Sequence, residues 1–91
     1  MPLSFGWDPA KARTNRSKHG IDFEEALTVF ADPLSLTVPD DAHARVGEDR
    51  FATIGMSNRG RLLVVIHSDA ADAVRIISAR RATRRERKDY E

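Results

Sequence analysis

One stretch near the end of this 91-residue chain decides the fold: Arg75-Ile76-Ile77-Ser78-Ala79-Arg80-Arg81-Ala82-Thr83-Arg84-Arg85-Glu86-Arg87-Lys88-Asp89-Tyr90. Its first half is apolar. Together with the preceding Val74, the residues up to Ala79 predict a strand that is held by burial in a sheet. Its second half is too charged to be buried. Thr83 and Glu86 have the spacing of a capping box, so we expect a C-terminal helix from about Thr83. Arg80 and Arg81 fall where the strand meets the helix, a place that can hold a charged donor fork at a fixed position.

The cationic half of this stretch has two interpretations. An arginine-rich junction between two rigid elements fits a polyanion such as RNA. A solvated surface helix that is merely rich in arginine explains the same residues. For Arg84, Arg85, Arg87 and Lys88 a solvated face with diffuse attraction to phosphates is the simplest interpretation. This stretch alone leaves both interpretations open.

The composition predicts one small globular domain that spans residues 1–91. Hydrophobic residues make up 41% of the chain and charged residues 32%, which suits one modest core. The longest aliphatic run, Leu62 to Ile66, is too short to cross a bilayer. Neither a secretory signal nor a cysteine is visible. We therefore expect a cytoplasmic protein without disulfides or thiolate chemistry.

The charges are segregated along the chain, although the net charge is only +1. The segment from Arg75 to Lys88 is basic, with Glu86 as its one counter-charge. Acidic residues gather in the middle of the chain, at Asp32, Asp40, Asp41, Glu48 and Asp49. This asymmetry predicts one face for a polyanion and suggests another for a basic partner.

The first third of the chain predicts a strand and two helices. Leu3–Trp7 alternates as a short strand does, and Asp8-Pro9 then begins a helix that Gly20 ends. A second helix begins at Ile21–Ala26, where Asp22 and Glu25 have capping-box spacing. Asp32-Pro33 ends this helix. Its core face is expected to comprise Phe23, Ala26, Leu27 and Phe30.

The rest of the chain predicts a meander of strands. The expected elements are a half-buried strand at Leu34–Val38, a polar loop at Pro39–Gly47, a strand at Arg50–Met56, a turn at Ser57–Gly60, a central strand at Leu62–Ile66 covered on both faces, a turn at Asp69–Asp72 and the last strand at Val74–Ala79. Strands joined by short turns pair antiparallel. We therefore expect an α+β fold, with the N-terminal helices packed on one face of a curved antiparallel sheet and a C-terminal helix.

No metal site and no cofactor are expected. His19, His43 and His67 are scattered, and no phosphate-binding glycine motif is present. Ser78 lacks a nucleophile-elbow motif and is read as a strand residue. The side chains that remain for chemistry are Lys18, His19, Arg50, Arg75, Arg80, Arg81 and Tyr90.

These residue types suit the cleavage of RNA by its own 2′-hydroxyl group. That reaction needs a base for the 2′-proton, donors for the charged phosphorane and an acid for the leaving 5′-oxygen. A positioned donor at developing charge contributes about 2.7–4 kcal/mol, and arginine supplies such donors without exchanging a proton. His19 is the residue in this set whose type exchanges protons near neutral pH, so it is the candidate acid or base. Tyr90 is held in reserve for that role, and Arg75 and Lys18 are expected to position the phosphate.

Each candidate also has a simpler interpretation. His19 falls at a helix end, where a histidine can merely complement the helix dipole. Arg50, which follows Glu48 and Asp49, can form a surface ion pair worth about 0–1 kcal/mol. Arg75 lies between apolar neighbours and either faces solvent or is placed for function. Tyr90 can pack on the sheet, and Trp7 is more typical of a core than of a base-stacking platform.

Four groups of residues resemble the BrnT family, at the family's own spacing and over nearly the whole chain. They are Trp7-Asp8-Pro9 with Lys11; Asn15 with Lys18-His19-Gly20-Ile21 and Phe23-Glu24-Glu25-Ala26; Arg50-Phe51 with Ile54-Gly55; and Arg75-Ile76-Ile77-Ser78-Ala79-Arg80 with Ala82, Glu86-Arg87 and Tyr90. The resemblance implies a RelE-like fold and a ribonuclease toxin of a type II toxin–antitoxin pair that blocks translation. It also implies a BrnA-like ribbon-helix-helix antitoxin, through which the complex reaches operator DNA.

The residues and the resemblance together predict a metal-independent endoribonuclease. The expected catalytic residues are His19, Arg50, Arg75, Arg80 and Tyr90, and the expected RNA-binding residues are Lys11, Lys18, Arg81, Arg84 and Arg85. A non-catalytic RNA- or DNA-binding module and an interaction subunit are the alternatives. The nuclease hypothesis requires that the guanidinium groups of Arg50, Arg75 and Arg80 meet in one hollow on the sheet, and it fails if they point to separate sides of the molecule. The most informative observation is whether they converge on one patch with His19.

Overall fold

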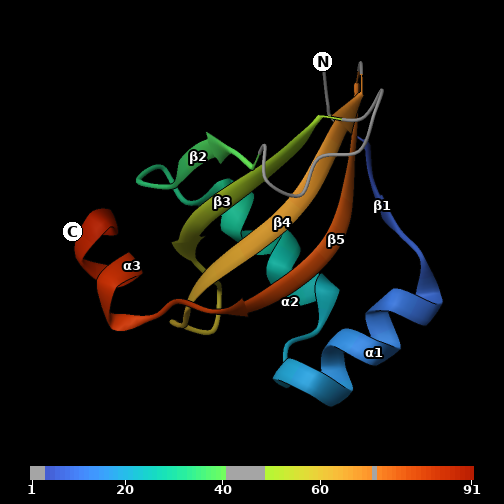
Figure 1. Ribbon diagram of the computed structural model, residues 1–91, viewed down its shortest axis with the longest axis horizontal. Coiled ribbons are helices and arrows are strands. Elements are labelled where there is room, and N and C mark those ends of the chain that lie inside the picture. Colours follow the sequence, from blue (N-terminus) through green and yellow to red (C-terminus); the bar gives the residue numbers. More distant parts are fainter. Residues whose placement is uncertain (1–3, 41–48, 71) are drawn as a thin grey trace.

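The computed structural model describes residues 4–40, 49–70 and 72–91. Their elements, in order, are strand β1 (Ser4–Trp7), helices α1 (Pro9–His19) and α2 (Phe23–Leu27), the 3-10 turn η1 (Thr28–Ala31), strands β2 (Leu36–Pro39), β3 (Arg50–Met56), β4 (Leu62–Ala70) and β5 (Ala73–Arg81), and helix α3 (Arg84–Tyr90). The strands form one curved sheet in the order β1-β5-β4-β3-β2 (Figure 1). The predicted strand start at Leu3, residues 41–47 of the predicted loop and Ala71 of the predicted turn lie outside the described residues.

The sheet is mixed, so the prediction of a wholly antiparallel sheet is wrong. Strands β2, β3, β4 and β5 do form an antiparallel meander, as their short connections require. Strand β1 instead pairs parallel with β5, from Ser4 opposite Ala73 to Trp7 opposite Ile76. Helices α1 and α2, the 3-10 turn η1 and strands β2, β3 and β4 lie between β1 and β5 in the described part of the chain, and a connection of that length lets two paired strands run in the same direction.

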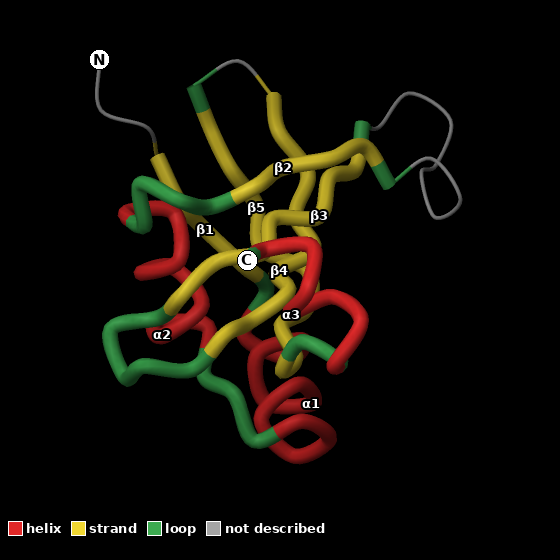
Figure 2. Tube along the Cα trace, turned by 90° about the vertical axis from the view of Figure 1, so that its left-hand side faces the viewer, coloured by secondary structure: helices red, strands yellow, loops and turns green. Residues whose placement is uncertain are grey.

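The core lies on one face of the sheet, under α2 and η1. Phe23 and Ala26 of α2 and Val29 of η1 pack with Leu63, Val65, Ile76 and Ala79 of the sheet. Leu27 and Phe30 pack against this cluster, so the predicted core face of the second helix is confirmed. Strand β4 is central in the sheet and buried from Leu62 to Val65, also as predicted. Figure 2 shows α2 and α3 on opposite sides of the sheet.

Helix α1 lies along the part of β5 that β1 leaves uncovered. Pairing with β1 ends at Ile76, so the backbone of β5 beyond that residue needs another partner. The buried side chain of Asn15 supplies it, because Nδ2 donates to the Ala79 carbonyl at 2.9 Å and Oδ1 accepts from the Ala79 N–H at 2.9 Å. Nδ2 also donates to the carbonyl of Ile21 at 3.0 Å. The Asn15 amide thus takes the place of a strand backbone and holds α1 beside β5.

Of the two predicted capping boxes, one forms and one does not. Thr83 Oγ1 accepts from the Glu86 N–H at 3.2 Å, and Glu86 Oε1 accepts from the Thr83 N–H at 2.8 Å. Asp22 precedes α2 but makes no capping hydrogen bond, so that prediction is wrong. Glu25 instead accepts from Ser57 Oγ at 2.7 Å and from Arg61 Nε at 2.9 Å, and the bond from Arg61 is the main cause of its lowered pKa. A buried carboxylate is stabilised by such partners, which tie α2 to the turn between β3 and β4.

The first strand of the meander differs from its prediction. It begins at Leu36, two residues later than expected, and pairs with β3 at the edge of the sheet. Its side chains are exposed and not half-buried: the exposed fractions are 44% for Leu36, 55% for Val38 and 68% for Leu34 just before it. The alternation correctly predicts a strand, but its apolar side chains stay exposed and line a hollow beside α3.

His67 is a core residue, because a chain of hydrogen bonds satisfies both nitrogens of its buried ring. Nε2 lies 2.8 Å from Thr53 Oγ1 and Nδ1 lies 2.6 Å from Asp69 Oδ1. Thr53 Oγ1 is in turn 2.8 Å from Thr37 Oγ1 of β2. No group of three or more metal-binding side chains occurs among the described residues, and no helix among them is long and apolar enough to cross a membrane.

Candidate active site

The sheet face opposite the core carries three of the predicted arginines. In the sheet, Arg50 is opposite Ser68, and Ser68 is opposite Arg75. Directly paired side chains point to the same face, so Arg50 and Arg75 share one. Val64 lies four residues before Ser68 on β4, and residues an even number apart on a strand point to the same face. Val64 is opposite Arg80, so Arg80 lies on that face too. The residue rows therefore place all three arginines on one side of the sheet.

A β-bulge in β5 makes this possible. Ile66 is opposite Ser78 but His67 is opposite Ile76, so Ile77 is the extra residue. Arg75 and Arg80 are five positions apart and would point to opposite faces of a regular strand. One extra residue reverses the alternation, so both side chains lie on the same face.

A hollow of about 390 Å³ lies between Arg50 and Arg80 on this face. We call it the arginine hollow. Its other lining residues are Asp40, Ala52, Val64, Ile66, Ile77, Ser78 and Glu86. The strand register places the backbones of Arg50 and Arg80 roughly 13 Å apart along the strands and roughly 10 Å apart across them. Their long side chains therefore approach the hollow from different sides, which suits an anionic group between them.

Glu86 of α3 fixes the orientation of Arg80. Arg80 Nη1 donates to Glu86 Oε1 at 2.7 Å and Nη2 donates to Oε2 at 2.8 Å. Nη1 also donates to the Arg81 carbonyl at 3.3 Å, so two of the five guanidinium N–H groups remain for a ligand. The bond with Arg80 is the main cause that lowers the pKa of Glu86 to about 2, and the bond with Glu86 raises the pKa of Arg80. Both groups are therefore charged at neutral pH.

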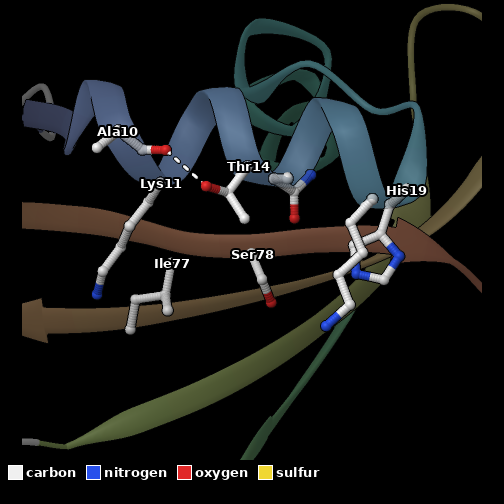
Figure 3. A pocket seen from close by; sticks show the side chains of 8 residues that line it. Ala10, Lys11, Thr14, His19, Ile77 and Ser78 are labelled. Atoms are coloured by element: carbon white, nitrogen blue, oxygen red, sulfur yellow. Dashed lines mark hydrogen bonds between the residues drawn. The ribbon is translucent and has the colours of Figure 1, made fainter.

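A second hollow of about 290 Å³ lies between α1 and β5. We call it the histidine hollow. Lys11, Lys18 and His19 line it, and Figure 3 shows Lys11 and His19 on either side of Ser78. Ile77 and Ser78 line both hollows. The bulge of β5 is therefore the wall between the candidate acid or base and the two arginines.

The other predicted site residues lie elsewhere. Arg75 shares the face of the arginine hollow but lines a different depression beside β1. The expectation that the three arginines meet in one hollow with His19 is therefore wrong, because the register sets Arg75 opposite Ser68, four residues along β4 from Val64, the residue opposite Arg80, and His19 lines the histidine hollow. Arg81 is opposite Leu63, whose side chain is in the core, so it lies on the face opposite to Arg80. Arg84 and Arg85 are exposed on α3. Tyr90 donates its hydroxyl to Asp32 Oδ2 at 2.6 Å, and this bond raises the pKa of Tyr90.

Sequence reasoning missed the roles of Asn15, Ser78 and Glu86 in this site. Asn15 positions the helix that carries Lys18 and His19, and its place in the family motif beside Lys18-His19-Gly20-Ile21 was its sequence signal. Ser78 was set aside because it has no nucleophile motif, yet it lines both hollows. Glu86 was recognised as a capping residue and counter-charge, but its pairing with Arg80 depends on the tertiary structure.

Comparisons with known proteins identify a family and a similar solved structure. Residues 7–86 match a family described as the ribonuclease toxin, BrnT, of a type II toxin–antitoxin system. The chain is also similar to the 1.1 Å crystal structure of the Brucella abortus ribonuclease toxin BrnT, with a TM-score of 0.66 and 30% sequence identity. That alignment covers 90% of this chain and 99% of the Brucella chain. Among curated protein sequences, no match was found.

Proposed function

The chain belongs to the BrnT family of ribonuclease toxins of type II toxin–antitoxin systems, and we propose that it cleaves RNA without a metal ion at the two hollows beside β5. The observation that carries this proposal is the convergence of Arg50 and Arg80 on one hollow, whose wall at Ile77 and Ser78 adjoins the hollow of His19. A phosphodiester group seated in the arginine hollow receives donors from two strands. The RNA then crosses β5 at the bulge.

The proposed reaction is an internal transfer within the RNA. The 2′-oxygen attacks phosphorus, the bond from phosphorus to the 5′-oxygen breaks, and the products carry a 2′,3′-cyclic phosphate and a 5′-hydroxyl. Arg80 and Arg50 stabilise the charge of the phosphorane, to which each positioned donor contributes about 2.7–4 kcal/mol. Because Glu86 already orients Arg80, this donor needs little rearrangement when the charge develops.

Proton transfer is assigned to His19, as the acid or the base. Lys11 and Lys18 line the same hollow and hold flanking phosphates, while Arg75 holds a phosphate farther along the same face. Tyr90 was the reserve for proton transfer. Its bond to Asp32 and its raised pKa favour a role in anchoring α3 instead.

The test is cleavage of RNA in the presence of EDTA by the unaltered protein and by Arg80→Ala. We expect cleavage in EDTA, a cyclic phosphate at the new 3′ end, and a loss of about 10²–10³ in kcat for the variant. Arg87→Ala is the control, since Arg87 is an exposed arginine of α3 outside both hollows. Full cleavage by Arg80→Ala would remove Arg80 from the mechanism, and inhibition by EDTA would contradict metal independence.

In the cell we propose that this activity blocks translation in the cytoplasm until a BrnA-like ribbon-helix-helix antitoxin binds the toxin. Expression of the unaltered protein should arrest growth, and Arg80→Ala should relieve the arrest. The RNA affinity of this variant should fall only by the amount expected for the loss of one positive charge. A protein that merely binds RNA or DNA would keep arresting growth in proportion to its affinity. That outcome would favour the binding module over the nuclease.

A further inference from the structure

An apolar surface at one end of the arginine-bearing face has no part in this mechanism. We call Leu34, Leu36 and Val38 the β2 surface; their side chains are exposed, Leu34 most of all. Leu36 is opposite Ile54 and Val38 is opposite Ala52, so both lie on the face of the arginine hollow. With Ala52, Ile54 and Val64 they line a third hollow of about 190 Å³, and Glu86 and Asp89 of α3 complete it.

The β2 surface lies on an open edge of the sheet. Strand β2 is the last strand in the order and pairs with β3 on one side, and no other strand within residues 4–40, 49–70 and 72–91 pairs with it. The outward backbone groups of an edge strand are a template for another strand, and proteins ordinarily protect such edges with charge, proline or cover. In β2, Pro39 has no N–H, so Thr37 offers the outward N–H. An edge that presents aliphatic side chains is instead typical of a partner that binds by strand addition.

The charges around this edge select the kind of partner. Asp32 precedes β2, Asp40 follows it, and Glu86 and Asp89 line the third hollow. Glu86 is already paired with Arg80, whereas Asp89 lines the third hollow and not the arginine hollow, so its charge repels phosphates from the third hollow. No aromatic side chain is among the residues that line the third hollow, whereas binding of single-stranded RNA bases commonly uses aromatic stacking. The surroundings therefore favour a protein segment with alternating aliphatic residues and flanking lysine or arginine residues.

We propose that an extended segment of the antitoxin adds to β2 as a sixth strand, with aliphatic side chains on Leu36 and Val38 and basic side chains near Asp89. This inference rests on the proposed function, because membership of a toxin–antitoxin family is what supplies the partner. The third hollow shares Ala52, Val64 and Glu86 with the arginine hollow. An antitoxin segment bound there therefore lies beside the path of RNA to Arg80. Its binding would in this way also inhibit RNA cleavage.

The test uses Leu36→Glu and Val38→Glu with the antitoxin encoded beside the toxin gene. The matched control is Ala70→Glu, which places the same charge on an exposed residue at the end of β4. Each β2 variant should weaken antitoxin binding by about 30-fold or more, as expected for a central buried contact. RNA cleavage by the free variants should be unchanged, and growth should stop even when the antitoxin is co-expressed. The control should bind the antitoxin normally.

Hydrogen exchange provides a measurement that needs neither a variant nor RNA cleavage. Addition of the antitoxin should slow amide exchange at Thr37 of the unaltered protein. Asp40 donates its N–H to Arg50 of β3, so Leu36 and Val38, which alternate with Thr37, also face β3 and the N–H of Thr37 points outward, where an added strand would engage it. Unchanged exchange there, or antitoxin binding by both Glu variants within threefold of normal, would overturn the proposal. Normal antitoxin binding combined with lost RNA cleavage would assign the edge to RNA and overturn it too. If the unaltered protein cleaves no RNA, the proposed function is contradicted. Amide hydrogen exchange and antitoxin affinity would still decide whether the antitoxin binds at β2.

Discussion

Glu86 holds Arg80 through both terminal nitrogens of the guanidinium group, at 2.7 and 2.8 Å. The same carboxylate accepts from the Thr83 N–H and so closes the capping box that begins α3. One side chain therefore fixes both the helix that follows β5 and the arginine at the end of β5. We interpret Glu86 as a positioning residue for Arg80, since a paired fork keeps its geometry when a phosphate arrives.

Glu86→Ala should lower kcat about tenfold and change KM less, because Arg80 keeps its charge but loses its orientation. Glu86→Gln should lose less, since glutamine can still complete the capping box. The measurement is steady-state RNA cleavage, with helix content followed by circular dichroism. Faster cleavage by either variant would show instead that Glu86 competes with RNA for Arg80.

Lowering the pH should weaken the contact of α3 with Arg80 over a pH range set by the pKa of Glu86. The pKa of this carboxyl is about 2 in the folded protein and 4.5 ordinarily, and the bond with Arg80 is the main cause. A lowered pKa stabilises the folded state above pH 4.5, and the contribution is lost as the pH falls from about 4.5 to 2. NMR chemical shifts of the α3 amides should change over this window, and in Glu86→Gln this step should disappear. A step centred at pH 4.5 in the unaltered protein would contradict the pairing.

Arg75→Ala should weaken RNA binding more than Arg81→Ala does. Both residues belong to β5, but the bulge leaves Arg75 on the face of the arginine hollow and Arg81 on the opposite one. Each phosphate contact to single-stranded RNA contributes about 0.7 to the slope of log affinity against log salt. Titrations at several salt concentrations should show that the slope falls by about 0.7 for Arg75→Ala and stays unchanged for Arg81→Ala. Equal slopes for both variants would place RNA elsewhere.

Tyr90→Phe should loosen the end of α3 without lowering RNA cleavage more than about threefold, well below the factor typical of a lost general acid or base. The Tyr90 hydroxyl is bonded to Asp32, and no residue of α3 is buried, so this bond is one of few anchors of the helix. Proteolysis near residues 84–91 should accelerate. A loss of cleavage above 100-fold with α3 intact would restore Tyr90 as a proton donor.

Asn15→Ala should destabilise the fold by about 3 kcal/mol, because it leaves the N–H and carbonyl of Ala79 and the carbonyl of Ile21 without their partner. Asn15→Asp should also destabilise it, since a carboxylate would face two carbonyl oxygens. Urea unfolding measures both effects. A loss below 1 kcal/mol for Asn15→Ala would mean that α1 is held by other contacts.

Local interactions explain why much of the fold was predictable from the sequence. Gly20 ends α1 in the left-handed conformation at φ 71°, and Thr83 with Glu86 begins α3, because such signals act over a few residues. The apolar run at Leu62 to Ile66 marked the central strand for the same reason. Most candidate cations were identified by residue type, which needs no structure. The family was indicated by motifs whose spacing along the chain is itself sequence information.

Contacts between distant residues were decided by the tertiary structure alone. Alternation shows which residues of one strand share a face, but not its partner, so the parallel pairing of β1 with β5 was missed. A bulge leaves no local signal in Ile76-Ile77-Ser78, yet it decides that Arg75 and Arg80 share a face. Arg50 reaches the same hollow because the register of three strands places it there. The chemistry of each side chain was therefore set by the sequence, and its neighbours were set by packing, because register depends on all strands pairing at once.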